Sequence, residues 1–275
     1  MKTEDIFEQN LQQLEGNVQQ IAHFRNRAGT YEKRYDFRSI TFDFFADQLT
    51  KLVKITPDEN FKYRNILDFA SGTGDLSRYL AQSLNESRIY AVDLTFDMLF
   101  NGNKLNISDE NPVWVCANGI QLPFSDDKFQ FVMMKFALHH FDDSLTKFML
   151  SEIRRVLTTN GFVIVMDVIS PEQNPSKDFF KTLNVMREPA NRNYRTKTEI
   201  QELFHGHGLK LVTDYSKTHT YQICVEKWLR EFYFFENTLP FVLNSDEITK
   251  NQINLQKVCD FHFMDIQAGM FVFQM

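Results

Sequence analysis

Cysteine is scarce in this sequence, which contains 3 among its 275 residues. Cys116, Cys224 and Cys259 stand far apart, and no pair has the spacing of a CxxC motif. An odd number of widely separated cysteines argues against a disulfide framework and against a zinc site. We therefore expect three reduced cysteines that behave as small buried hydrophobic side chains.

Long hydrophobic runs and an excess of positive charge are also missing. No stretch of 18 apolar residues occurs, so the sequence predicts no membrane-spanning helix. Residues 1–5 lead into a polar pattern and not into the apolar core of an export signal, which favours a cytoplasmic location. The formal net charge of −6 argues against a broad surface for nucleic acid.

Phenylalanine, by contrast, is abundant, with 28 residues in the chain. These side chains must fill a core or line an apolar substrate pocket, and composition alone does not separate the two uses. The length of the chain suits one large domain, or one domain with a cap.

Residues 63–170 alternate between short apolar runs and amphipathic segments, which is typical of strands that alternate with helices. Several runs are almost continuously apolar, as in a parallel sheet covered by helices on both faces. We expect an α/β fold with a doubly wound, mostly parallel sheet that binds ligands at the carboxyl ends of its strands. The predicted strands are Asn65–Phe69, Arg88–Val92, Val113–Cys116, Gln130–Lys135 and Phe162–Val168, and the predicted helices are Asp75–Gln82, Phe96–Asn101 and Leu145–Leu157.

The regions on either side of this core differ from it. Residues 1–60 have a helical pattern, and we expect them to form a lid before a single domain over residues 61–275. Residues 217–264 are rich in helix formers and aromatics, which predicts a helical insertion before the last strand. Two further strands, at Leu209–Asp214 and Gly269–Phe273, would complete a seven-stranded sheet, and Thr196 would cap a helix over Lys197–Phe204.

The stretch from Asn65 to Ser77 passes from an apolar run, through two glycines, to a helical pattern. Gly72 and Gly74 lack the Cβ atoms that would keep a ligand away from the backbone. The amides that follow open a helix N-terminus, which suits a carboxylate or a phosphate. Asp93 ends the next strand about 20 residues further on, the spacing at which a carboxylate accepts both hydroxyls of a ribose. Ser77 replaces the third glycine of a dinucleotide fingerprint, so a nucleoside with an amino-acid tail fits better than a dinucleotide.

Four stretches, in order, resemble the motifs of the class I S-adenosylmethionine-dependent methyltransferases. They are Ile66–Gly74, Ala117–Phe124, Phe136–Phe141 and Glu152–Leu157. The first is most similar to the ubiquinone/menaquinone-biosynthesis type and the wider type 11 group, and the resemblance covers residues 24–215. It implies a Rossmann-like fold, S-adenosylmethionine as cofactor, and methyl transfer to a small-molecule acceptor by in-line displacement.

The resemblance also implies which residues hold the cofactor. Asp93 would accept from the ribose, and Leu94 and Met98 would pack on the adenine. Asn118 stands at the position where many relatives have an Asp that contacts the edge of the adenine. The amide oxygen of Asn118 can still accept a hydrogen bond from the adenine amine. The implied set is Tyr31, Asp68, Ala70, Gly72, Thr73, Gly74, Asp93, Leu94, Met98, Asn118, Gly119 and Lys135.

Two further groups are candidates for contact with the acceptor. His139 and His140 follow the fourth strand, where the family faces the transferred methyl group, and the resemblance favours His140 as a proton acceptor. A structural pair that caps the next helix is the other interpretation. Arg187, Arg192 and Tyr194 lie where relatives contact substrate and could hold a carboxylate or phosphate, or belong to a solvated loop.

Two other functions remain open from the sequence. A catalytically inactive cofactor-binding scaffold or partner subunit is suggested by Asn118 and by the altered turn at Thr159–Gly161, which depart from the family pattern. A nicotinamide-dependent oxidoreductase is disfavoured by Ser77 and by the later motifs. We expect a monomer or homodimer that uses no metal and acts on a small molecule.

Overall fold

The structure is a computed structural model that describes residues 17–18, 20–33, 37–55, 64–84, 86–105, 111–187, 193–215, 220–230 and 235–275. The predicted substrate residue Arg192 lies outside these ranges. None of the described helices is long and apolar enough to cross a membrane.

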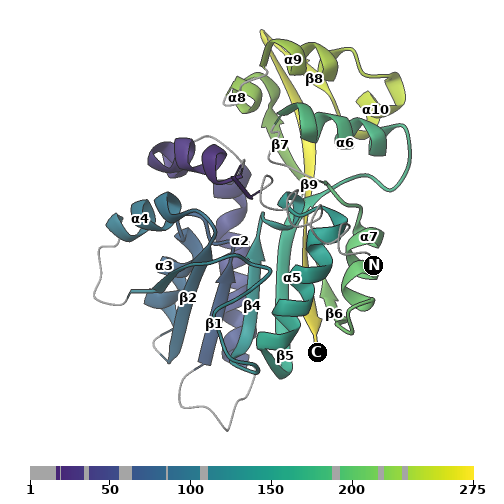
Figure 1. The fold of residues 1–275 in the computed structure, drawn as a ribbon. Coiled ribbons are helices and arrows are strands. Elements are labelled where there is room, and N and C mark those ends of the chain that lie inside the picture. Colours follow the sequence, from purple (N-terminus) through teal and green to yellow (C-terminus); the bar gives the residue numbers. More distant parts are fainter. Residues whose placement is uncertain are drawn as a thin grey trace, which may run out of the picture.

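A single mixed sheet forms the centre of the molecule (Figure 1). Its order is β3-β2-β1-β4-β5-β9-β6, in which β1 to β5 run parallel and β9 runs antiparallel to β5 and β6. The strands are Arg64–Phe69 (β1), Ser87–Asp93 (β2), Val113–Cys116 (β3), Phe129–Lys135 (β4), Leu157–Ile169 (β5), Lys210–Asp214 (β6), Thr220–Cys224 (β7), Gln256–Val258 (β8) and Phe261–Gln274 (β9). The predicted α/β, doubly wound class is confirmed.

Helices cover both faces of this sheet. The α-helices are Phe37–Ile55 (α2), Asp75–Ser83 (α3), Phe96–Lys104 (α4), Asp143–Val156 (α5), Ser176–Arg187 (α6), Lys197–His205 (α7), Val225–Arg230 (α8), Phe235–Leu243 (α9) and Glu247–Gln252 (α10). Successive residues of a strand point to opposite faces, so Ile66 packs with α2 and α3 while Leu67 packs with α5 and α7. This alternation explains the continuous apolar runs in the sequence, because both faces of each central strand are buried.

The expected strand count of seven is wrong for the described chain, in which the sheet has nine strands. β9 begins at Phe261, eight residues before the predicted start, and its first half extends beyond the main sheet. β7 and β8 both pair with this extension. A long strand carries unpaired backbone groups on its edges, and the two short strands satisfy them.

A cap stands at one end of the sheet, at the top of Figure 1, and consists of α6, α8, α9, α10, β7 and β8. The sequence predicted a purely helical insertion over 217–264, and α6 was not expected. Phe179 on α6 stacks on Phe241 of α9 with 5.2 Å between ring centroids, which joins the two halves of the cap. The cap therefore starts before β6, and long-range aromatic packing brings its parts together.

The predicted cap of α7 is confirmed. Thr196 accepts from the backbone N–H of Glu199, whose side chain accepts from Thr196 N–H, and this capping box opens α7. The turn expected at Thr159–Gly161 instead lies within β5, which runs continuously from Leu157, although Asn160 has φ of 65°, the left-handed conformation that asparagine tolerates.

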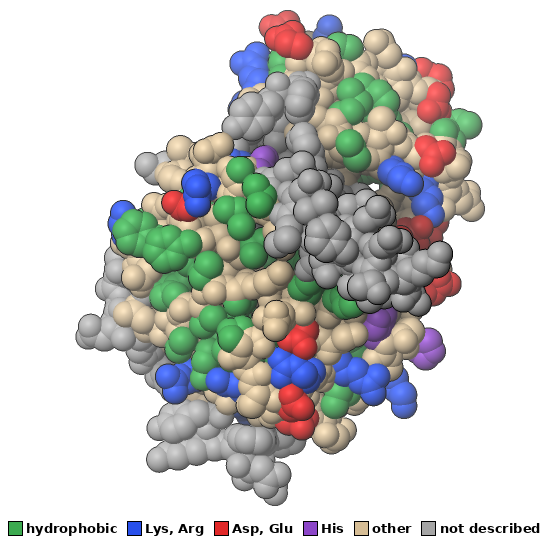
Figure 2. All heavy atoms as spheres, in the orientation of Figure 1, with side chains coloured by type: hydrophobic (Ala, Val, Ile, Leu, Met, Phe, Trp, Pro, Cys, Tyr) green, Lys and Arg blue, Asp and Glu red, His purple; other side chains and the backbone are tan. Residues whose placement is uncertain are grey.

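The expectation for the cysteines is only partly right. Cys224 is buried, but Cys116 and Cys259 are exposed. Both exposed residues lie at strand ends or turns, where a small side chain has no core to enter. The phenylalanines are likewise divided, because Phe96 and Phe100 on α4 stack on each other at the surface. Figure 2 shows hydrophobic side chains gathered on the side of the molecule where Figure 1 places α4.

Candidate functional site

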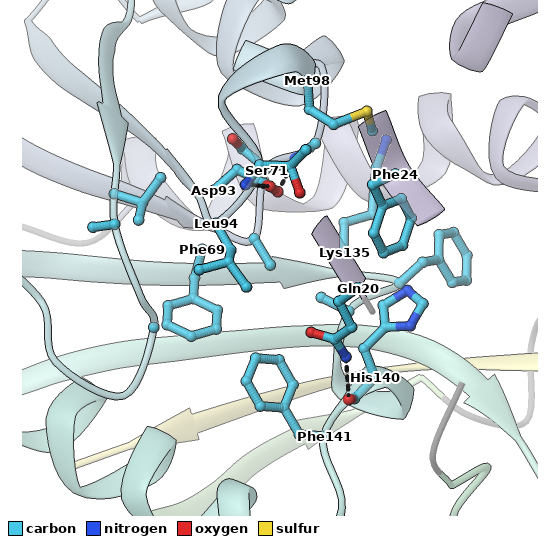
Figure 3. Close-up of a pocket in the computed structure, with 18 of the residues that line it drawn as sticks. Gln20, Phe24, Phe69, Ser71, Asp93, Leu94, Met98, Lys135, His140 and Phe141 are labelled. Atoms are coloured by element: carbon cyan, nitrogen blue, oxygen red, sulfur yellow. Dashed lines mark hydrogen bonds between the residues drawn. The ribbon is translucent and has the colours of Figure 1, made fainter. Parts of the chain in front are cut away.

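A cavity of about 380 Å³ opens at the carboxyl ends of β1, β2 and β4, the edge at which the sequence predicts a ligand (Figure 3). The loops after these strands form its base, and helical residues 17–18 and 20–27 with α2 form its cover. Eleven of the predicted site residues line it, and they are Tyr31, Ala70, Gly72, Thr73, Asp93, Leu94, Met98, Asn118, Gly119, Lys135 and His140.

The glycine loop between β1 and α3 folds through three residues with positive φ: Ala70 at 54°, Gly72 at 59° and Gly74 at 67°. A Cβ atom on Gly72 would lie 3.4 Å from the Met98 methyl group and 3.6 Å from the Tyr31 ring. The absent side chain leaves the backbone of the loop open to the cavity, as the sequence predicts.

Replacing Gly72 by alanine is expected to destabilise the protein by about 1–2 kcal/mol, because alanine must take a left-handed backbone and crowd Met98. Thermal or denaturant unfolding measures the effect. Gly29→Ala is the matched control, since a Cβ at Gly29 meets nothing within 4 Å. Equal stabilities of the two variants would contradict the strain assigned to Gly72.

Asp93 ties the end of β2 to the glycine loop. Its Oδ2 accepts from the Gly72 N–H at 2.8 Å, and its Oδ1 accepts from the Thr95 N–H at 2.8 Å. Burial raises the pKa of this carboxyl above its usual range, although these backbone hydrogen bonds oppose the rise. Figure 3 shows Asp93 beside Ser71 in the wall of the cavity. The carboxylate is thus held in one orientation, with further lone pairs available for ligand hydroxyls.

Asn118 and Gly119 form a turn on the same side of the cavity. The Oδ1 atom of Asn118 accepts from the Ile120 N–H at 3.2 Å, which fixes the orientation of the amide. Gly119 packs against Phe69 so closely that a Cβ would lie 2.3 Å from the ring. The glycine is therefore required by packing against Phe69.

Asp68 is a predicted cofactor residue that does not line the cavity. It is buried behind the loop, where the Ser77 hydroxyl donates to its Oδ2 at 2.5 Å. Burial raises the pKa of Asp68 to about 7. Gly74, also predicted, caps α3 and packs against Trp114 outside the cavity wall. Both residues therefore support the glycine loop from the side that faces away from the cavity.

Lys135, at the end of β4, lies at the cover of the cavity. Its Nζ atom is 2.5 Å from Asp75 Oδ2 and 4.7 Å from the centroid of the Phe42 ring. The ammonium group is therefore paired with a carboxylate and packed against an aromatic face.

The two histidines have different environments. The His139 ring is buried, with Nδ1 at 2.7 Å from Asp167 Oδ1. His140 lines the cavity and meets the Phe24 ring edge-on at 5.1 Å between centroids. Its backbone oxygen accepts from Gln20 Nε2 at 2.9 Å, as drawn in Figure 3. The geometry brings His140, and not His139, to the cavity.

The predicted substrate residues Arg187 and Tyr194 are elsewhere. An Arg187 nitrogen donates to the Tyr194 hydroxyl at 2.6 Å, and the guanidinium lies 4.5 Å from the Trp228 ring. Both side chains are buried, and neither lines the cavity. The structure does not bring these two residues to the cavity, because Arg187 ends the unexpected helix α6 and packs into the cap, while the Tyr194 ring lies 5.4 Å from the ring of the buried His139.

Some lining residues had no clear sequence signal. Gln20 and Phe24 reach the cavity from the N-terminal helix, and Phe141 follows the histidines. Ser71 Oγ, which also lines the cavity, is buried and has no hydrogen-bond partner within the described part of the chain. No cluster of three potential metal ligands occurs among the described residues.

Comparisons with known proteins agree with this geometry. Residues 66–161 match the family model described as a methyltransferase domain. The demethylmenaquinone methyltransferase of Bacteroides fragilis is 27% identical over 149 residues, which cover 53% of this chain and 60% of that protein. This chain thus matches somewhat more than half the length of that relative.

Solved structures share the architecture. The YcgJ protein of Bacillus subtilis aligns with a TM-score of 0.70 and 18% identity, covering 83% of this chain and 97% of that one. Phosphoethanolamine N-methyltransferase 2 of Haemonchus contortus, solved with phosphomonomethylethanolamine and S-adenosylhomocysteine, aligns with a TM-score of 0.52 and 16% identity, covering 83% and 52%. At these identities the likeness establishes the fold. Residues 66–161 of this chain are therefore similar to the methyltransferase domain, about half of the chain is similar to the demethylmenaquinone methyltransferase, and the described chain has the fold of the solved methyltransferase-like structures.

Proposed function

We propose that this protein transfers a methyl group from S-adenosylmethionine to a neutral small-molecule acceptor. The observation that carries the proposal is one cavity with two kinds of wall. One wall has the glycine loop, Asp93 and Asn118, and the other has His140 among aromatic side chains. Such a cavity can hold a nucleoside with an amino-acid tail beside a second, apolar molecule.

The residues present fit the cofactor. The partnerless Ser71 hydroxyl is an available hydrogen-bond donor and acceptor at the cavity wall. Asp93 would accept from the ribose hydroxyls, Met98 and Leu94 would pack on the adenine, and Asn118 would meet its edge. The open backbone at Gly72 would accommodate the amino-acid portion, near Tyr31.

When bound, the cofactor would supply an electrophilic methyl carbon for transfer to the acceptor, and its sulfur would keep the electron pair of the bond that breaks. The protein must align the acceptor and exclude water. His140 would take the proton that a hydroxyl or carbon acid loses when it is methylated. The cover formed by Gln20, Phe24 and Tyr31 would keep water from the reacting atoms.

The lining residues favour an uncharged acceptor. Phe24, Phe136 and Phe141 provide apolar surface around His140. Among the described lining residues the only Lys or Arg is Lys135, which is ion-paired with Asp75. A carboxylate or phosphate on the acceptor would therefore find no cation that is not already engaged.

Incubation of the protein with methyl-labelled S-adenosylmethionine and a panel of neutral phenols and quinols tests the proposal. The first acceptor to try is reduced demethylmenaquinone with a short tail, because the Bacteroides fragilis relative is named for demethylmenaquinone. Label transfer to a neutral acceptor is the expected result. Micromolar cofactor binding without transfer to any member of the panel would favour the inactive scaffold.

His140→Ala is expected to lower kcat about 100-fold and to leave cofactor affinity unchanged, because it removes the proton acceptor but not the nucleoside site. Steady-state kinetics and calorimetry measure the two quantities. His205→Ala, at an exposed position that ends α7, is the control. Unchanged turnover in His140→Ala would show that His140 is not the proton acceptor, and catalysis would then depend on alignment of the two substrates alone.

A further inference from the structure

The short segment that carries His140 is held by hydrogen bonds from outside itself. This segment is the 3-10 helix η2 (Leu138–His140) with Phe141, between β4 and α5. A buried guanidinium, that of Arg195, donates to the carbonyl oxygens of Leu138 at 3.2 Å and Phe141 at 2.9 Å. Arg195 therefore holds the backbone on both sides of the histidine pair.

A second buried charge holds the middle of the segment. Asp167 Oδ2 accepts from the His139 N–H at 3.0 Å, and Asp167 Oδ1 lies 2.7 Å from His139 Nδ1. The His139 ring in turn lies against the His140 ring, with 4.1 Å between centroids. The orientation of the buried histidine thus limits where the His140 ring can lie.

The two remaining carbonyl groups of the segment also accept external hydrogen bonds. The Asn193 N–H donates to His139 O at 3.1 Å, and Gln20 Nε2 donates to His140 O at 2.9 Å. All four consecutive carbonyl oxygens from Leu138 to Phe141 are therefore held by donors from other elements. A single 3-10 turn has only two short-range hydrogen bonds of its own, from His140 N–H to Ala137 O and from Phe141 N–H to Leu138 O, so these external contacts help to determine its conformation.

Burying Asp167 and Arg195 costs free energy, since each is almost completely inaccessible to water. Arg195 also bonds to Asp143 and Thr146 in the first turn of α5, so a role limited to holding that helix is the competing explanation. The contacts to η2 are in excess of what that role needs. They hold the residues on both sides of His140, the histidine that lines the cavity among the described residues.

We propose that Asp167 and Arg195 are positioning residues, which hold the His140 ring at the cavity wall in the orientation that the acceptor requires. The inference rests on the proposed function of His140. It adds two residues outside the cavity lining that would affect turnover through the orientation of the His140 ring.

The first test needs no acceptor and reads the His140 ring directly. The ring carbon–proton resonance of His140, assigned by its loss in His140→Gln, is compared in wild type, Asp167→Asn and Arg195→Lys. We expect one sharp resonance in wild type and a shifted or broadened one in both variants. The remaining surface histidine resonances should not change. An unaltered His140 resonance in both variants would overturn the proposal.

The second test is a double-mutant cycle with reduced short-tail demethylmenaquinone as the acceptor. Arg195→Lys and Asp167→Asn should each lower kcat at least tenfold in the wild-type background, but less than twofold when His140 is already alanine. A merely structural role would give the same factor in both backgrounds, which would contradict positioning. Arg154→Lys is the matched control, because Arg154 also donates to a backbone carbonyl, that of His207, away from the cavity.

Calorimetry with S-adenosylmethionine separates the two proposals. Unchanged cofactor affinity in Arg195→Lys and Asp167→Asn shows that the variants are folded and that the nucleoside site is intact. If wild type binds no cofactor and methylates nothing, the proposed function fails, while the resonance test still decides whether the two residues hold His140.

Discussion

Replacing Asp93 by alanine should abolish measurable binding of S-adenosylmethionine in the micromolar range. The carboxylate would accept two hydroxyl hydrogen bonds, each worth about 2 kcal/mol when the acceptor is charged, so affinity should fall about 1000-fold. The same substitution frees the N–H groups of Gly72 and Thr95, which now donate to Asp93 at 2.8 Å each. Isothermal calorimetry with the cofactor and its demethylated product measures the loss.

Two further variants separate recognition from folding at this position. Asp93→Asn keeps the size of the side chain and one acceptor oxygen, so it should bind more tightly than Asp93→Ala but more weakly than wild type. Asp47→Ala, on the surface of α2 and paired with Lys51, should leave affinity unchanged. If Asp93→Ala bound S-adenosylmethionine with wild-type affinity, the proposed nucleoside site would be wrong, and the glycine loop would be only a turn.

The wall of the cavity formed by the glycine loop and Asp93 could be predicted from sequence because its signals are local. Gly72, Gly74 and the end of β2 at Asp93 follow from a strand, a turn and the next strand, all within 30 residues. Parallel strands align their carboxyl ends, so the topology brings the loop and the carboxylate together without further information. The hydrogen bond from Gly72 to Asp93 is the physical result.

The wall of the cavity around His140 could not be predicted in the same way. The resemblance implies that Arg187 and Tyr194 contact substrate, but α6 carries Arg187 into the cap against Trp228, and Tyr194 lies against His139 behind the cavity wall. That helix is recognised only through distant partners such as Phe241 on α9. Gln20 reaches His140 across 120 residues, and no local periodicity reports a contact of that range.

The extra strands have the same cause. β7 and β8 are short, and each exists because the first half of β9 offers a free edge. The sequence predicts the terminal strand only from Gly269, where its apolar pattern becomes continuous against β5 and β6. The residues before Gly269 fall partly in the predicted helical insertion over 217–264, because strand formation there depends on partners found elsewhere in the chain.

Asp68 should make the stability of the protein depend on pH between about 4 and about 7. Its pKa is about 7 in the folded protein against an ordinary value of 3.8, so the folded state binds the proton more tightly than the unfolded state. Stability from this group is therefore present at low pH and is lost as pH rises through this window. A separation of roughly 3 pKa units corresponds to about 4 kcal/mol when the loss is complete.

Asp68→Asn isolates this effect, because asparagine keeps an oxygen that can accept from the Ser77 hydroxyl but cannot ionise. The stability gained by the variant over wild type should grow by about 3 kcal/mol between pH 5 and pH 8, measured by denaturant unfolding. Burial also raises the pKa of Asp93, but both proteins share that contribution and it cancels in the difference. Asp47→Asn, at an exposed position, should show no such growth. A difference that is the same at both pH values would mean that Asp68 is ionised throughout, stabilised by Ser77 and Lys135, and could then serve as a permanent anion behind the glycine loop.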